Sequence, residues 1–148
     1  MMAETYIVNV EGAVWRRGRY MLIVRGLEEA HAAGLLSLVG GKVEDTEGQI
    51  ADVLEMTLRR EILEEVGLVV KETVYVHNTH FTAAGKNVID IVFLCRYESG
   101  EPLITDPGEV AEILWLTAAD VLNHPAAPTW TKDSIERVEQ VRSRLNWS

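Results

Sequence analysis

The chain has 148 residues, a formal net charge of −9 at pH 7 and one cysteine. This length predicts a single domain over residues 1–148, able to bury roughly two-thirds of the surface of its unfolded chain. The acidic charge argues against a nucleic-acid polymer as partner, because that binding rests on Lys and Arg, but it leaves open a small nucleotide held through a metal ion.

Membrane-spanning and secreted classes are also disfavoured. The sequence has no apolar run of the length that crosses a bilayer, and its start, Met-Met-Ala-Glu-Thr, lacks the basic and apolar regions of a signal peptide. We therefore expect a cytoplasmic protein without a membrane partner. Cys95 lies alone in the apolar run 91–95, which predicts a buried small side chain rather than a nucleophile or a disulfide.

The chain begins with a predicted β-hairpin. Residues 5–16 and 20–25 have the composition of strands, and Arg17-Gly18-Arg19 between them supplies a glycine for a tight turn. Residues 35–39 then lead into a predicted turn at Gly40 and Gly41.

A helix is predicted from about Asp52 to Val66. Apolar side chains recur every four residues along it, which is typical of a helix with one buried face. They are Leu54, Leu58, Ile62 and Val66, with Leu63 at the edge of the stripe. Gly67 follows directly and is expected to end the helix in a left-handed conformation.

The second half predicts another hairpin and two helices. Strands are expected at 72–80 and 88–97, with a turn at 83–86, and a further strand at 113–116. Thr117 and Asp120 have the spacing of a capping box, which predicts a short helix ending near Asn123. A last helix is expected from about Lys132 to Asn146, with Ile135, Val138, Val141 and Leu145 at helical spacing.

Three carboxylates lie together on the first predicted helix. Glu61, Glu64 and Glu65 are three and four residues apart, so they project from one face. Two carboxylates one turn apart, about 6 Å, repel by roughly 2–3 kcal/mol at an effective dielectric constant of about 20. A divalent cation turns this repulsion into attraction, and oxygen ligands without His or Cys indicate Mg²⁺, with Mn²⁺ as an alternative.

These residues resemble the signature of the Nudix hydrolases, which runs Gly, five residues, Glu, seven residues, Arg-Glu-aliphatic-x-Glu-Glu-x-Gly-aliphatic. Its second half matches at Arg60, Glu61, Ile62, Glu64, Glu65, Gly67 and Leu68. Its first half matches at Gly41 and Glu47, but twelve residues instead of seven separate Glu47 from Arg60. We interpret the excess as a five-residue insertion before the helix, which leaves the role of Glu47 open.

The resemblance implies an α/β fold, an α/β/α sandwich with a mixed sheet, and a Mg²⁺-dependent pyrophosphohydrolase. Metal on Glu61, Glu64 and Glu65 would bridge to phosphate oxygens and activate the attacking water. Gly40 or Gly41 is expected to present a backbone carbonyl to the metal, since glycine has no Cβ in the way. Arg60 is expected to orient a neighbouring glutamate. Relatives are often dimers, so a homodimer is possible.

A further carboxylate is expected from a later loop. Glu109 is the preferred candidate for an extra metal ligand or general base. Glu112 and Glu101 are alternatives, and each of the three is equally consistent with a solvated surface.

Several other polar and aromatic residues are consistent either with a contact to the substrate or with an ordinary structural position. Asn78 and His80 should face one side of their strand and His77 the other, and either side can meet a substrate or solvent. Phe81, Trp15 and Tyr20 suit either base stacking or the core. Four arginines near the first hairpin can receive phosphates or simply be solvated: Arg16, Arg17, Arg19 and Arg25.

Three functions are consistent with the sequence. The favoured one is hydrolysis of a nucleoside triphosphate or another nucleoside diphosphate derivative. The second is a Nudix-fold module that binds a nucleotide without cleaving it. The third is isomerisation of an isoprenoid diphosphate, which usually requires a nucleophilic Cys, and Cys95 fits that role poorly. The proline and tyrosine that mark two family subgroups after the motif are absent from the stretch that reaches Phe81 to Gly85.

Overall fold

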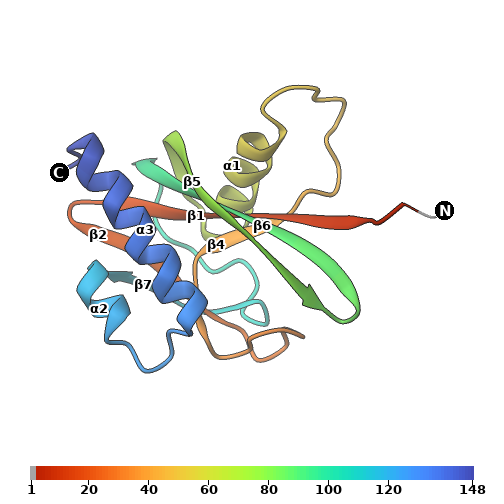
Figure 1. The fold of residues 1–148 in the computed structure, drawn as a ribbon. Coiled ribbons are helices and arrows are strands. Elements are labelled where there is room, and N and C mark those ends of the chain that lie inside the picture. Colours follow the sequence, from red (N-terminus) through yellow and green to blue (C-terminus); the bar gives the residue numbers. More distant parts are fainter. Residues whose placement is uncertain (1–2) are drawn as a thin grey trace.

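The computed structural model describes residues 3–148, and strand β1 is central to its mixed sheet (Figure 1). β1 pairs in parallel with β6 and antiparallel with β2 and β4. The strand order is β3-β2-β1-β6-β5, with β4 also on β1 and β7 on β2. The strands are β1 (Tyr6–Arg16), β2 (Arg19–Arg25), β3 (Leu36–Ser37), β4 (Val39–Lys42), β5 (Val69–Ala83), β6 (Lys86–Ser99) and β7 (Val110–Leu116).

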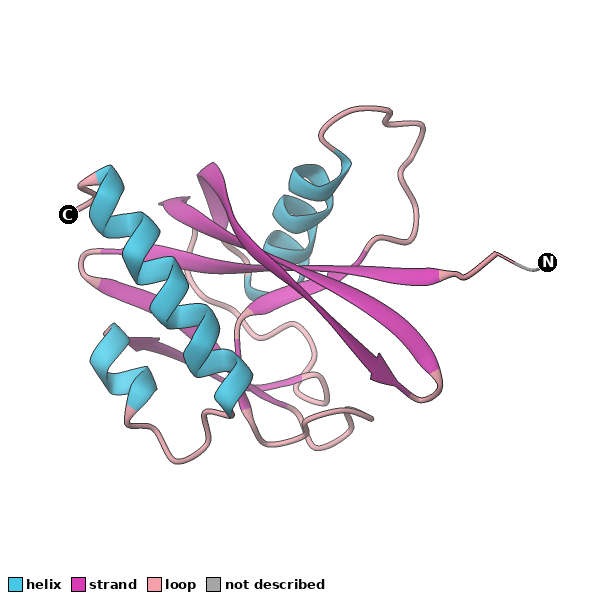
Figure 2. Ribbon diagram, viewed as in Figure 1, coloured by secondary structure: helices cyan, strands magenta, loops and turns pink. Residues whose placement is uncertain are grey.

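Helices cover both faces of this sheet, as Figure 2 shows. They are α1 (Val53–Val66), α2 (Ala118–Leu122) and α3 (Thr129–Leu145). α1 lies on one face, and α2 and α3 lie on the other. The expected α/β sandwich with a mixed sheet is therefore confirmed. None of the helices within residues 3–148 combines the length and apolar character needed to cross a bilayer.

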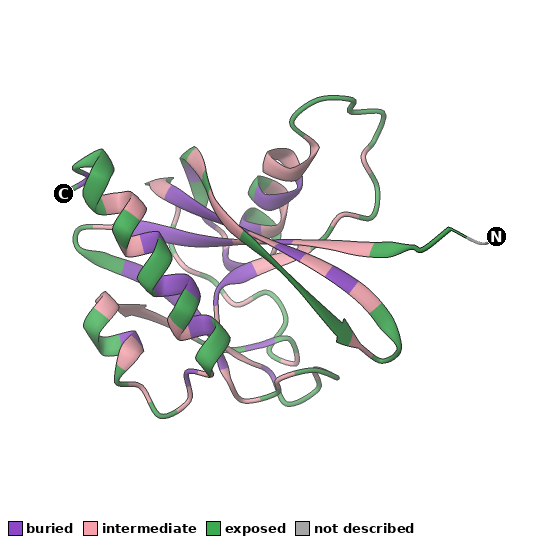
Figure 3. Cartoon of the chain, viewed as in Figure 1, coloured by how far each residue is buried: buried purple, intermediate pink, exposed green. Residues whose placement is uncertain are grey.

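Alternation along the strands divides the core into two layers. In β1, Val10 and Val14 pack toward α1, whereas Ala13 and Trp15 pack toward α2 and α3. This is the two-residue period of a strand whose faces are both covered. Figure 3 shows that the buried positions concentrate where the sheet lies under the helices. Burying one large apolar side chain contributes about 1.5–3 kcal/mol, so these layers orient α1 and α3 firmly.

Helix α1 has the predicted apolar stripe. Leu58, Ile62 and Val66 are fully buried, and Leu63, at the edge of the stripe, is half exposed. Gly67 adopts φ 72° and its N–H donates to the carbonyl of Leu63, as expected for a glycine that ends a helix. Residues 43–52 before the helix form a loop that extends away from the sheet in Figure 1. This loop includes the region where the sequence predicts an insertion.

The segment at Gly40 and Gly41 is a strand, so the predicted turn is wrong. β4 pairs with β1, and Gly40 lies opposite Glu11 in this pairing. Among residues 3–148, positive φ angles occur elsewhere, and neither of these glycines has one. Glycine is needed here for close packing, because a methyl group on Gly40 would lie 1.9 Å from the carbonyl oxygen of Val10.

Both predicted hairpin turns are present. Arg17 and Gly18 have φ angles of 49° and 83°, and Ala84 and Gly85 have 51° and 74°. Two successive positive φ angles are typical of the turns that fit twisted hairpins. The second hairpin is longer than predicted at both ends, because β5 and β6 continue to pair from Val69 with Ser99 to Ala83 with Lys86.

The C-terminal helices are held by polar contacts as well as by their apolar faces. The capping box is confirmed, since Thr117 and Asp120 exchange backbone-to-side-chain hydrogen bonds of 3.1 Å. Helix α3 begins at Thr129, three residues earlier than expected, with Pro128 as its N-cap. Leu145, which the helical spacing predicts in the apolar stripe, is instead 43% exposed.

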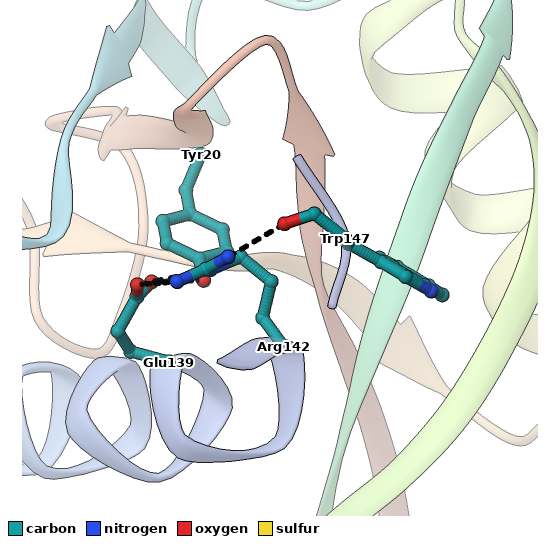
Figure 4. A network of polar contacts seen from close by, with 4 residues as sticks. All are labelled: Tyr20, Glu139, Arg142 and Trp147. Carbon is teal, nitrogen blue, oxygen red and sulfur yellow. Dashed lines mark hydrogen bonds and ion pairs between the residues drawn. The ribbon is translucent and has the colours of Figure 1, made fainter. Parts of the chain in front are cut away.

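A network of four residues fastens the end of α3 to β2 (Figure 4). The hydroxyl of Tyr20 donates to Glu139 at 2.5 Å, and Arg142 donates to the same carboxylate and to the backbone carbonyl of Trp147. The Trp147 side chain is buried in the layer under α3. Tyr20 and Trp15 are also buried in this layer, so they belong to the core and not to a stacking surface.

Candidate functional site

An acidic cavity of about 430 Å³ lies beside the C-terminal half of α1. Six carboxylates line it, together with one amino group. The lining residues are Lys42, Glu44, Glu61, Glu64, Glu65, Thr105, Asp106, Glu109 and Val110. The three glutamates of the helix are thus brought together with Glu109, the loop residue that the sequence analysis preferred.

Strand β4 brings the backbone of Gly41 against the carboxylate of Glu61. A methyl group on Gly41 would lie 2.5 Å from Cδ of Glu61 and 2.6 Å from its Oε2. Only glycine leaves room for the carboxylate in this position. Gly40 does not line the cavity, and its close neighbour is the backbone of β1.

The crowded carboxylates retain protons more strongly than free glutamates do. Burial, followed by the charge of Glu64, raises the pKa of Glu61. Burial, followed by the charges of Glu61 and Glu109, raises the pKa of Glu65 to about 8. Desolvation and like charges each disfavour the ionised form, and a bound cation relieves both.

The loop between β6 and β7 carries Glu109 to the helix. Thr105 Oγ1 donates to the carbonyl of Glu64 at 2.7 Å, and Leu103 N–H donates to that of Val66 at 3.0 Å. On its far side the Glu109 carbonyl accepts from Gly26 N–H at 2.7 Å. These bonds hold Glu109 across the cavity from α1.

Arg60 makes a different contact from the expected one. Its Nη1 donates to the backbone carbonyl of Asp45 at 3.1 Å, which ties the loop 43–52 to the helix. Among residues 3–148 it forms no ion pair with a glutamate. Its positive charge still lowers the pKa of Glu61, against the larger effect of burial.

The alternative carboxylates lie elsewhere. Glu112 is an exposed residue of β7, opposite Val24 of β2, and Glu101 is exposed in the loop after β6. Glu47 is exposed in the loop 43–52 with φ 51°. None of the three lines the acidic cavity.

The sequence analysis missed the roles of Glu44, Asp106 and Lys42 in lining this cavity. Glu44 and Lys42 follow Gly41 so closely that the strand pairing of β4 decides where they lie. The motif spacing indicated Glu47 instead of Glu44, because spacing along the chain does not show how β4 pairs with β1.

The donor set suits a hard divalent cation, although the side chains do not yet enclose one. Carboxylates without thiol or imidazole are the ligands that Mg²⁺ and Mn²⁺ prefer. Gly41 leaves open the space that a Cβ would fill next to Glu61. Across residues 3–148, no three acidic, His or Cys side chains converge closely enough to surround an ion.

A second cavity, of about 420 Å³, lies on the opposite face of the sheet, beside α3. Its walls are aromatic and its floor is polar. The floor includes Asn9, Glu11 and Asp90, and the walls include His31, Phe81 and Trp130. His77 and His80 also line this cavity. Strand alternation predicts that they face opposite sides of the sheet, but both reach the same cavity.

Arg25 lines the second cavity, and its charge also acts on the acidic one. It ends β2, at the opposite end of that strand from Arg19, so the expected cluster of four arginines does not form. Arg25 pairs with Glu29 at 3.0 Å, and its charge acts on Glu11 in one cavity and on Glu65 in the other.

Cys95 is fully buried in the layer under α1. Burial raises the pKa of its thiol to about 12, so little thiolate exists at neutral pH. This agrees with the prediction that Cys95 is a core residue, and it argues against chemistry that needs a nucleophilic cysteine.

Comparison with known proteins gives consistent matches in sequence and in structure. A family model described as NUDIX domain matches residues 6–138. The NAD-capped RNA hydrolase NudC of Salmonella heidelberg (strain SL476) is 29% identical over 121 residues, a match that covers 82% of this chain and 43% of that protein. The same figures hold for NudC of Salmonella typhi. The chain thus spans less than half the length of these curated relatives.

Solved structures match along nearly their whole length. The MutT NUDIX hydrolase from Burkholderia pseudomallei superposes with a TM-score of 0.75 at 29% identity, covering 91% of this chain and 99% of that one. The MutT protein from Methanosarcina mazei Go1 gives a TM-score of 0.77 at 25% identity, covering 96% and 99%.

Proposed function

Since the chain belongs to the Nudix family and is a hydrolase, we propose that it cleaves a diphosphate linkage in a nucleoside triphosphate or a related nucleoside diphosphate derivative, with Mg²⁺ as cofactor. The observation that carries this proposal is the meeting of Glu61, Glu64, Glu65 and Glu109 in one cavity against Gly41. Mn²⁺ is the alternative cation.

Each lining residue has a defined task in this proposal. Glu61, Glu64 and Glu65 would hold the cation, whose chemistry there would be to neutralise phosphate charge and to lower the pKa of a water molecule. Glu109 faces them from the loop and accepts a proton from the attacking water. Lys42 offers an amino group to the phosphates, which an otherwise acidic cavity repels. The backbone carbonyl of Gly41, beside Glu61, is a further oxygen donor.

The second cavity accommodates the nucleoside in this proposal. Its aromatic walls suit a planar base. Because one relative is named an NAD-capped RNA hydrolase, NAD is one of the compounds to test. A net charge of −9 favours small nucleotides over a polymer.

Phosphate or pyrophosphate release from a panel of nucleoside triphosphates, nucleoside diphosphate sugars and NAD, with Mg²⁺, tests the proposal. We expect turnover of at least one class, and we expect Glu64→Gln to reduce it by about two or more orders of magnitude. The folded stability of Glu64→Gln should be unchanged or slightly raised, because the substitution removes like-charge repulsion.

Glu55→Gln is the matched control, since Glu55 lies in the first turn of the same helix and does not line the cavity. It should retain turnover. Nucleotide binding without any hydrolysis by the wild-type protein would instead favour the alternative of a catalytically silent binding module.

A further inference from the structure

The floor of the second cavity is a row of polar side chains that the proposed hydrolysis does not use. Asn9 of β1 lies opposite Asp90 of β6, and Asp90 lies opposite Thr79 of β5. Glu11 is the next residue of β1 on the same face of the sheet. Asp90 is only 8% exposed, whereas Glu11 is half-buried at the cavity. Burying a carboxyl group costs free energy unless the group is hydrogen-bonded, so the hydrogen bonds of Glu11 and Asp90 determine what this floor can bind.

The hydrogen bonds within this row converge on Asp90. Asn9 Nδ2 donates to Asp90 Oδ1 at 2.7 Å. Burial, followed by the charge of Asp90 and a hydrogen bond with it, raises the pKa of Glu11 well above its usual range. The raised pKa favours the protonated form of Glu11, which shares a hydrogen bond with Asp90. Toward the cavity, Glu11 and Asp90 offer carboxyl oxygens as acceptors, and Asn9 keeps its carbonyl oxygen and one N–H.

The charge of the cavity also indicates which part of a nucleotide fits. The floor carries the carboxyl groups of Glu11 and Asp90, and the guanidinium of Arg25 is engaged by Glu29 and by the carbonyl of His31. A phosphate would meet acceptors on this floor and be repelled. A neutral group with N–H donors would be bound.

Flat walls complete the cavity. The ring of His31 lies nearly parallel to Phe81, at 6.0 Å and 12°, and to Trp130, at 6.4 Å and 23°. Phe81 is 38% and Trp130 is 55% exposed, so part of each aromatic side chain stays accessible to a ligand. Aromatic faces of this kind stack on bases of any sequence, so they contribute affinity while the floor contributes selectivity.

We infer that this cavity selects a base whose edge presents two adjacent N–H donors, as guanine does with its ring N–H and amino group, and that Glu11 and Asp90 determine this specificity. The inference rests on the proposed function only for the expectation that the ligand is a nucleotide. Adenine places a ring acceptor beside its amino group, and hypoxanthine lacks the amino group, so each leaves a buried acceptor unpaired. Such a mismatch lowers affinity by about tenfold or more.

Calorimetric titration of the metal-free protein with GMP, IMP and AMP tests the inference without requiring hydrolysis. We expect GMP to bind at least about tenfold more tightly than IMP or AMP. Asp90→Asn should abolish the preference for GMP, because the new amide places an N–H donor opposite the N–H donors of guanine. Glu11→Gln should keep it, because the glutamine amide still donates to Asp90 and still offers an acceptor.

Three further variants separate selectivity from affinity and from folding. Trp130→Ala should weaken all three nucleotides alike and leave the preference intact. Glu72→Gln removes a carboxylate from β5 outside the cavity and should change nothing. If Asp90→Asn does not fold, Glu11→Ala replaces it and should reduce the preference severalfold.

Equal affinity of the wild-type protein for the three nucleotides, no binding of any of them, or an undiminished GMP preference in Asp90→Asn would overturn the inference. A GMP preference in a protein that hydrolyses nothing would contradict only the proposed hydrolase function. Hydrolysis without base preference would contradict only the specificity assigned to Glu11 and Asp90.

Discussion

Among single residues, Glu65 departs clearly from the behaviour of a solvated glutamate. Its pKa of about 8 means that the folded, metal-free protein holds a proton that the unfolded chain releases near pH 4.5. The folded state therefore binds protons more tightly over this range. The stability linked to Glu65 is complete below the unfolded pKa and is lost as the pH rises through about 8.

We predict that the metal-free protein loses thermal stability between pH 6.5 and pH 8, by at most about 1.4 kcal/mol per pH unit for one proton. This window avoids the opposing effect of His77, whose lowered pKa matters only at more acidic pH. Glu65→Gln should reduce the dependence, and saturating Mg²⁺ should weaken it in the wild type. Glu11, whose pKa is also raised, lies outside the acidic cavity and keeps its own contribution in both cases. Thermal melts in EDTA and in Mg²⁺ measure this, and a flat profile in EDTA would show that Glu65 titrates normally.

Gly40 and Gly41 are adjacent, yet we predict different consequences for their substitution. Gly41→Ala pushes against the Glu61 carboxylate, a flexible side chain, so it should fold and lose cation affinity and turnover at least about tenfold. Gly40→Ala pushes against the backbone of β1 and should destabilise the fold by about 2–3 kcal/mol. Denaturant melts and turnover assays on both variants check this, and equal stability of the two would contradict it.

At the scale of elements, the sequence predicted what depends on local periodicity and capping. The stripe of α1, its end at Gly67, the two hairpins and the capping box at Thr117 all follow from neighbouring residues. Strand β4 was missed because two glycines favour a turn locally, and only the pairing with β1 makes them a strand. The extra length of β5 and the early start of α3 likewise depend on partners distant in sequence.

The network in Figure 4 carries a prediction about how α3 is attached. Tyr20→Phe removes a donor from the Glu139 carboxylate and should lower the free energy of unfolding by about 1–2 kcal/mol without changing nucleotide binding. Arg137→Ala is the control, because its ion pair with Asp133 is exposed on the same helix and should cost less than about 0.5 kcal/mol. Similar losses for the two variants in urea melts would argue against the network.

At the scale of the whole molecule, the sheet separates two cavities of different chemistry. The acidic one faces α1 and the aromatic one faces α3. Arg25 lines the aromatic cavity, and its charge also lowers the pKa of Glu65 in the acidic one, against the larger effect of burial. The motif predicted Glu61, Glu64 and Glu65, and the expectation of a further carboxylate from a later loop suggested Glu109. It did not predict Glu11 or Asp90, since a single acidic residue in a strand gives no signal until parallel pairing of β1 with β6 sets it on a cavity floor.

The central claim is that the carboxylates beside Gly41 hold a divalent cation, and calorimetric titration with Mg²⁺ near pH 7 tests it most directly. With a pKa of about 8, Glu65 is mostly protonated at pH 7 before Mg²⁺ binds, so binding of Mg²⁺ should release close to one proton. The released proton is measured by repeating the titration in buffers of different ionisation enthalpy, because the observed heat of binding then changes with the buffer. Glu65→Gln should bind more weakly and release less, and Glu55→Gln should match the wild type. No heat of binding, or binding without proton release, would contradict the account.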